Sequence, residues 1–152
     1  MKFAVTLALA AAAFTLVTPA SAQFAKPEDA VKYRQSVMFV MAQHFGRVGA
    51  MVNGRAPYDA KAALENAEIA ADMSKLPWPG FAASTKDITT NTKAKPEIWA
   101  EQAKFKDHGE KMQGEMQKLV AAAKTNNLDN LKAAFGPTAE SCKSCHDNFR
   151  NK

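Results

Sequence analysis

A five-residue run near the C-terminus, Cys142-Lys143-Ser144-Cys145-His146, holds the residues whose types and spacing could do chemistry. On a helix, Cys142 and Cys145 lie one turn apart, and His146 lies one turn beyond Cys142. Both thiols can therefore meet the two vinyl groups of one haem while the imidazole reaches its iron. This spacing is the attachment signature of c-type haem. It predicts one covalently bound haem c per chain, with His146 as a ligand of the metal.

Three other uses of the two cysteines compete with haem attachment. A thiol-disulfide oxidoreductase pair usually begins a helix in a fold that has strands, whereas Cys142 and Cys145 lie near the end of a helical chain. A zinc site would need a second pair of ligands, which the sequence does not supply. A disulfide between residues three apart is strained on a regular helix. Haem attachment is therefore favoured, and the oxidoreductase is the enzymatic alternative.

Length and composition are typical of one small helical domain. The chain has 152 residues and a net charge of +5, which allows one domain and makes two improbable. Much of its apolar content is alanine, which favours helix over sheet. The positive charge is spread along the chain without a block of Lys and Arg, so nucleic-acid binding is poorly supported. We therefore predict an all-α protein.

The first 22 residues are predicted to be a signal peptide. Lys2 precedes an almost wholly apolar stretch from Phe3 to Val17, and Ala20-Ser21-Ala22 has the pattern that a signal peptidase cleaves. The apolar stretch is shorter than the roughly 20 residues that a membrane-spanning helix needs. We therefore expect an exported, periplasmic protein whose single domain covers residues 23–152. Removal of Lys2 lowers its charge by one, and no membrane span remains.

Four segments after the leader have apolar residues at helical spacing. The first segment opens at residues 27–29 and stops at Asn53-Gly54, and the second follows Pro57 and ends near Leu76-Pro77. The third runs from Pro96 to Ala123, and the fourth from Leu128 to Phe149. Short links predict that the first two segments are antiparallel neighbours, and likewise the last two. We therefore predict an antiparallel four-helix bundle with haem c near the C-terminal helix. Pro137 is expected to kink or restart the fourth helix.

About 20 residues, from 76 to 95, join the second and third segments. Loops of that length are uncommon unless they serve a function or cover something. Trp78 and Phe81 in this loop could cover the edge of a haem, or they could cap the bundle as ordinary core residues.

Further stretches carry a resemblance to a known family. They are Tyr33-Arg34-Gln35, His44-Phe45-Gly46-Arg47, Ala56-Pro57-Tyr58-Asp59, Leu76-Pro77-Trp78, Lys95-Pro96-Glu97-Ile98-Trp99, and Cys142 through Arg150. With the haem motif near the C-terminus, the chain resembles the class II c-type cytochromes, the cytochrome c prime family, over essentially all of residues 23–152. The resemblance implies haem between the helices and often a homodimer joined through the first two helices. It also implies electron transfer with periplasmic redox partners, or binding of nitric oxide or carbon monoxide.

The residue on the other face of the iron decides between these two roles, and the resemblance implies that it is Met38. A low-spin branch of the family has a methionine on the first helix at a position that aligns with Met38. Ligation by His146 and Met38 would suit an electron carrier, which is not an enzyme. Many members have Leu or Phe there, which leaves the iron five-coordinate and open to a gas. Methionine is also a common core filler, and spacing alone gives Met38 no preference over Met41.

Arg34 and Gln35 interrupt the apolar stripe one turn before Met38. A charge buried there would be costly without a partner. The resemblance implies that both residues contact the haem and that its propionates are the partners. The alternative is that both side chains extend to solvent.

Arg150 lies four residues beyond His146 and therefore on the same helix face. It could influence the imidazole or a bound gas, or it could serve only the helix dipole. His44 and His108 are interpreted as surface or structural residues and not as ligands.

Overall fold

The computed structural model describes residues 23–152, and the predicted signal peptide lies outside this range. Seven helical elements follow one another in the described residues, and four of them are long. Strand pairing in this range is limited to one isolated antiparallel bridge between Ala94 and Arg150. None of the helices described is both long and apolar enough to cross a membrane. The predicted all-α class is confirmed.

Helix α1 spans Pro27–Val52 and begins where the sequence indicates. Proline at the first turn is compatible with a helix start, and Glu28 and Asp29 complement the positive end of the helix dipole. The helix ends at Asn53, whose backbone amide and side-chain amide both donate to the carbonyl of Gly49, at 3.0 and 2.7 Å. These bonds satisfy a carbonyl that has no partner within the helix.

Helices α2, Ala60–Met73, and α5, Leu128–Phe149, are each capped at their start by a side chain. Asp59 accepts a hydrogen bond from the amide of Ala62, and Asn127 accepts from two amides at the start of α5. Pro137 lies inside α5, which continues through it as one helix. The expected restart is therefore wrong. Pro137 is exposed. The missing backbone N–H of this proline therefore lies on the side of α5 that faces solvent.

The third predicted segment is divided into α3, Glu97–Ala100, and α4, Gln102–Ala123. The break is at Glu101, whose φ of −116° and ψ of 49° are not helical. Two anchors hold α3 away from the axis of α4. Ile98 is buried, and the indole nitrogen of Trp99 donates to the carbonyl of Phe81 at 3.1 Å. The prediction of one unbroken helix from Pro96 is wrong because these tertiary contacts outweigh local propensity.

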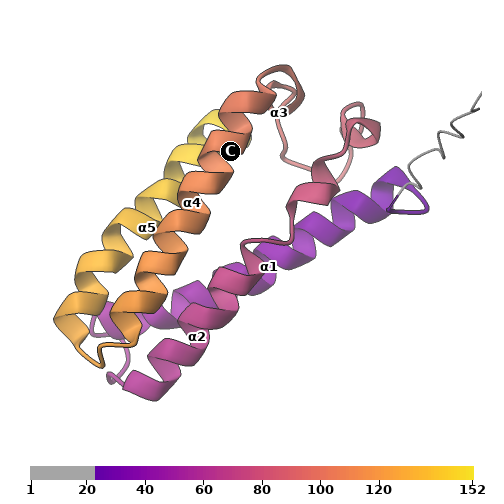
Figure 1. Ribbon diagram of the computed structural model, residues 1–152. Coiled ribbons are helices and arrows are strands. Elements are labelled where there is room, and N and C mark those ends of the chain that lie inside the picture. Colours follow the sequence, from indigo (N-terminus) through magenta and orange to yellow (C-terminus); the bar gives the residue numbers. More distant parts are fainter. Residues whose placement is uncertain (1–22) are drawn as a thin grey trace, which may run out of the picture.

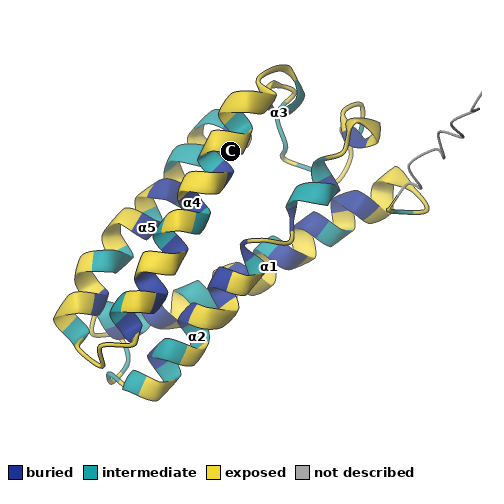
Figure 2. Ribbon diagram, in the orientation of Figure 1, coloured by how far each residue is buried: buried dark blue, intermediate teal, exposed yellow. Residues whose placement is uncertain are grey.

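The long helices form two antiparallel pairs, α1 with α2 and α4 with α5, which meet at one end and diverge at the other (Figure 1). At the closed end, the rings of Phe45 and Phe135 stack with centroids 4.5 Å apart. A Cβ at Gly49 would lie 2.7 Å from the Phe135 ring, so glycine permits this close approach. Buried residues line the inner faces and exposed residues the outer ones (Figure 2).

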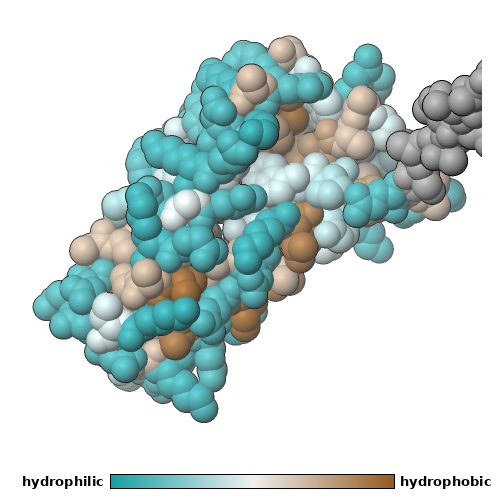
Figure 3. Space-filling view, in the orientation of Figure 1, coloured by the Kyte–Doolittle hydropathy of each residue, from teal (hydrophilic) through white to brown (hydrophobic). Residues whose placement is uncertain are grey.

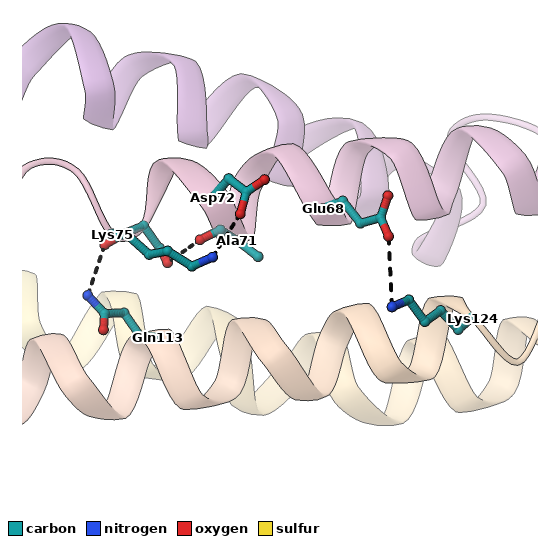
Figure 4. Close-up of polar contacts among 7 residues, drawn as sticks. Glu68, Ala71, Asp72, Lys75, Gln113 and Lys124 are labelled. Atoms are coloured by element: carbon teal, nitrogen blue, oxygen red, sulfur yellow. Dashed lines mark hydrogen bonds and ion pairs between the residues drawn. The ribbon is translucent and has the colours of Figure 1, made fainter.

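The seam between α2 and α4 is closed by small residues in its core and by polar contacts at its rim. Ala63, Ala67 and Ala70 on α2 are fully buried, which lets the helices approach closely. Gln113 on α4, labelled in Figure 4, donates to the carbonyl of Ser74, which directly precedes Lys75, at 3.2 Å. The exposed rim pair in Figure 4, between Glu68 and Lys124, is 3.9 Å long and contributes little to stability.

Candidate functional site

A cavity of about 560 Å³ lies between the diverging helix pairs. Side chains from α1, the segment between α2 and α4, α4 itself and α5 line it, and most of the exposed lining is apolar. Figure 3 shows pale and brown residues, of intermediate and high hydropathy, between the two helix pairs. The volume lies within the range of about 300–1,000 Å³ that is typical of pockets for small molecules and cofactors.

Helix α5 places all three residues of the attachment motif on the wall of this cavity. Cys142, Cys145 and His146 all line it, and neither cysteine is in a disulfide. Both cysteines are half-buried, and His146 is exposed to the cavity. The structure therefore brings together the two thiols and the imidazole that the sequence singles out.

The surroundings of the two thiols oppose thiol-disulfide exchange. Burial, together with the neighbouring Cys142, raises the pKa of Cys145 to about 11. Burial also raises the pKa of Cys142. The thiolate is the reactive form in disulfide exchange, and redox-active cysteines have lowered pKa values. These cysteines are thiols at neutral pH, which disfavours the oxidoreductase alternative.

The imidazole of His146 is kept neutral by its surroundings. Burial lowers its pKa, and the positive charge of Arg150 lowers it further, while Asp147 acts in the opposite direction. The neutral imidazole is the form that ligates a metal. Arg150 also lines the cavity at the end of α5. Its guanidinium therefore contributes to the lowered pKa of His146, and an influence on a bound gas stays a prediction.

Helix α1 contributes Met38 to the same cavity, and the side chain is half-buried. Met41 from α1 and Met112 from α4 also line the wall, and both are buried. The structure therefore brings Met38 to the cavity that His146 lines from α5. It places two further thioethers there as well.

Arg34 and Gln35 hold the loop that covers the cavity. The guanidinium of Arg34 donates from Nη1 to the carbonyl of Gly80 at 2.7 Å and from Nη2 to the hydroxyl of Thr92 at 3.0 Å. The residue is 3% exposed, and burial lowers its pKa. Gln35 donates to the carbonyl of Asn91 at 2.6 Å. Arg34 therefore does not extend to solvent, and both residues line the cavity.

Aromatic side chains of the loop and of α4 form another part of the wall. Trp78 and Phe81 both line the cavity, so they cover it and do not merely cap the bundle. The Phe105 ring lies edge-on to Phe81, with centroids 4.9 Å apart. Phe105 lies within the third segment of helical spacing, residues 96–123, but the spacing did not show that it faces a cavity.

The three histidines of the chain have different roles. His44 shares a hydrogen bond of 2.9 Å with Asn66 on α2, in agreement with its predicted structural role. His108 lines the cavity and packs edge-on against Phe149, with centroids 5.6 Å apart. The sequence indicates a surface or structural residue at His108 and does not show that it lines the cavity, because no motif surrounds it.

The cavity fits haem c in shape and charge. Its wall holds three cations, Arg34, Lys93 and Arg150, and no acidic residue. Cations and an apolar wall suit a flat apolar ring that carries two carboxylates. Within residues 23–152, no cluster of His, Cys, Asp or Glu could by itself hold a metal ion. A haem held by two thiols and one imidazole therefore agrees with the donor set better than a zinc site does.

Comparisons with known proteins agree with this geometry. The profile of the family described as Cytochrome C′ matches residues 29–150. The chain is 49% identical to cytochrome c′ of Alcaligenes xylosoxydans xylosoxydans over 130 residues, which is 86% of this chain and 99% of that protein. The crystal structure of cytochrome c′ from Rubrivivax gelatinosus superposes with a TM-score of 0.81 at 46% identity, over 85% of this chain and all of that one.

A second solved structure is described as a nitric oxide complex of a cytochrome c prime mutant from Alcaligenes xylosoxidans. It has a TM-score of 0.79 and 48% identity, over 86% of this chain and 99% of that one. Both structural relatives match the described helices over nearly their whole length. The predicted four-helix bundle is confirmed by these alignments.

Proposed function

The chain belongs to the cytochrome c′ family of class II c-type cytochromes, and we propose that it is a periplasmic electron carrier that turns over no substrate. Its cofactor is covalent haem c. Haem c supplies an iron that changes between Fe(III) and Fe(II). The protein contributes an apolar cavity, an attachment site and ligands for that iron.

Three residues of α5 hold the haem in this proposal. The thiols of Cys142 and Cys145 attach it covalently, and His146 is the ligand from α5. The proposal is supported by the position of all three on one cavity wall. It is also supported by the lowered pKa of His146, because a neutral ring nitrogen can ligate iron at physiological pH.

Arg34 and Gln35 are proposed to orient a haem propionate from α1. Arg34 donates three hydrogen bonds to the loop, to oxygen atoms of Gly80, Thr85 and Thr92. A guanidinium has five N–H groups, so donors remain for a carboxylate. The buried cation has no acidic partner among the described ion pairs. A propionate would provide the missing counter-charge.

Electron transfer is proposed because Met38 lines, from α1, the cavity that His146 lines from α5. Ligation by both residues would complete the iron's coordination and favour outer-sphere electron transfer. The test is an absorption spectrum of the purified, haem-containing protein in both oxidation states. A low-spin spectrum is expected, and Met38→Ala should convert it to high-spin. Met41→Ala is the matched control and should leave the spectrum low-spin.

Gas binding is the second candidate function, favoured by the solved relative described as a nitric oxide complex. In this case Met38 would fill the distal pocket without bonding to the iron. The same spectra separate the two functions. A ferrous protein that stays high-spin and binds carbon monoxide rapidly would contradict ligation by Met38 and establish a gas-binding site for nitric oxide or carbon monoxide.

A further inference from the structure

Helices α1 and α5 make direct contact through the stacked rings of Phe45 and Phe135, toward the closed end of the bundle. Toward the open end, the cavity lies between them, lined by Gln35 and Met38 on one side and His146 on the other. At this end, a single stretch of chain crosses between the two helix pairs (Figure 1). We call its residues 91–95 the strap.

The first half of the strap is held by α1. The amide nitrogen of the Gln35 side chain donates to the carbonyl of Asn91 at 2.6 Å. Nη2 of Arg34 donates to the hydroxyl of Thr92 at 3.0 Å. The same hydroxyl accepts from the backbone amide of Ala94 at 3.2 Å, which links this attachment to the second half of the strap.

The second half of the strap is held by the end of α5. Residues 93–95 run antiparallel to residues 149–151 around the bridge between Ala94 and Arg150. Two backbone hydrogen bonds form this contact, from the amide of Asn151 to the carbonyl of Lys93 at 2.8 Å and from the amide of Lys95 to the carbonyl of Phe149 at 3.0 Å. The strap therefore joins α1 to α5 within five residues.

The side chain of Lys95 adds a cation to the end of α5. Its Nζ donates to the carbonyls of Asp147 and Asn148, at 3.1 and 3.2 Å. Carbonyls in the last turn of a helix have no partner within the helix, and a cation there complements the helix dipole. These two carbonyls directly follow His146 in the chain. Lys95 is not among the residues that line the cavity.

We propose that the strap ties the open ends of α1 and α5 together across the mouth of the haem cavity, and that Lys95 is a positioning residue that fixes the last turn of α5 and thereby the orientation of the His146 ring. This inference rests on the proposed role of His146 as iron ligand. Lys95 acts through the helix end and touches neither the haem nor the iron.

The first test measures amide hydrogen exchange in the haem-containing protein. Lys95→Met removes both contacts to the carbonyls, and the amides of Lys95, Asn151 and Arg150 should lose protection by roughly tenfold. Lys86→Met is the matched control, because it removes the same charge from the same loop and Lys86 makes no side-chain hydrogen bond or ion pair in the described residues. It should leave these amides unchanged, and Lys95→Arg should restore most of the protection.

The second test reads the orientation of the His146 ring at the iron, by the g values of the ferric protein in electron paramagnetic resonance spectra, which can be recorded for either coordination number. Lys95→Met should shift these g values or broaden their signals, and Lys86→Met should not. If Lys95→Met protein does not fold, Thr92→Val releases the other end of the strap and should have the same two effects in weaker form.

Two results would overturn the inference. If amide exchange in Lys95→Met protein equals that in Lys86→Met protein, the contacts of Lys95 do not hold the strap. If protection falls while the g values stay unchanged, the strap does not orient His146. Failure of the electron-transfer proposal is distinguishable, because it is read from the spin state of the unaltered protein.

Discussion

The two cysteines of the attachment motif show how burial selects the chemistry of a side chain. A C-x-x-C pair can serve in disulfide exchange or in haem attachment, and spacing alone allows both. In the structure, the raised pKa values of Cys142 and Cys145 keep both thiols protonated. Their reactivity as nucleophiles is thereby limited at neutral pH.

This protonation state predicts the pH dependence of alkylation of the haem-free protein by iodoacetamide. Because burial raises the pKa of Cys145 to about 11, its thiolate fraction below that pH rises about tenfold for each pH unit. The alkylation rate at Cys145, followed by mass spectrometry, should still be rising at pH 10. The denatured chain is the control, and its rate should be half-maximal near pH 8.5 and level off by about pH 9.5. A plateau below pH 8 in the folded protein would show an activated thiol.

Residues with a local motif could be assigned from the sequence, and residues with distant partners could not. The spacing of Cys142, Cys145 and His146 puts two thiols and an imidazole on neighbouring turns of one helix. Their common position on the cavity wall was therefore predictable from the sequence. Arg34 was identified as a buried charge, but its partners on the loop lie 46 to 58 residues away. Such contacts depend on how the loop folds back, which no periodicity in the sequence encodes.

At the scale of elements, helical periodicity predicted the four long helices and their pairing. It failed at Glu101, where tertiary contacts override it. At Pro137 the periodicity was right and the expected restart was wrong, because an exposed proline is tolerated within α5. It also did not show that the pairs diverge around a cavity. That shape depends on side-chain size, with Gly49 at the closed end and the aromatic wall at the open end.

Gly109 on α4 packs directly against the Trp78 ring of the loop, and substitution there should disturb both stability and the haem. A Cβ at this position would lie 2.6 Å from the Trp78 ring. That ring is held by its hydrogen bond to Ser74, at 2.9 Å, and by contact with Phe105. Gly109→Ala should therefore lower the free energy of unfolding by about 1–3 kcal/mol. The displaced ring should also shift the Soret band, because Trp78 lines the cavity.

Gly114 provides the matched control on the same helix. It is exposed, and a Cβ there would meet nothing within 4 Å. Gly114→Ala should raise the free energy of unfolding by up to about 1 kcal/mol through helix propensity alone. Urea unfolding of the haem-containing variants measures both effects. Equal changes in the two variants would contradict close packing of Trp78 on α4.

At the scale of the whole molecule, the exposed apolar surface is unevenly distributed. The large hydrophobic side chains that are exposed within residues 23–152 are Phe39 and Val40 on α1, Ile69 on α2, and Leu76 just after it. Helices α4 and α5 expose none of comparable size in that range. Phe39 lines the cavity, whereas Val40, Ile69 and Leu76 do not. Apolar surface gathered in this way on one helix pair is typical of an interaction face. It supports the homodimer through the first two helices that the family resemblance implies.

The homodimer can be tested by placing a charge on this face. Ile69 is 39% exposed in the single chain, and Ile69→Lys would bury an unpaired ammonium group in a contact between two α1–α2 faces. The unaltered protein should sediment as a dimer at micromolar concentration, and this variant as a monomer with the same haem spectrum. Ala133→Lys, on the exposed side of α5, adds the same charge outside the proposed interface and should remain dimeric. A monomeric unaltered protein, or a dimer that survives Ile69→Lys, would show that these hydrophobic residues do not form the contact.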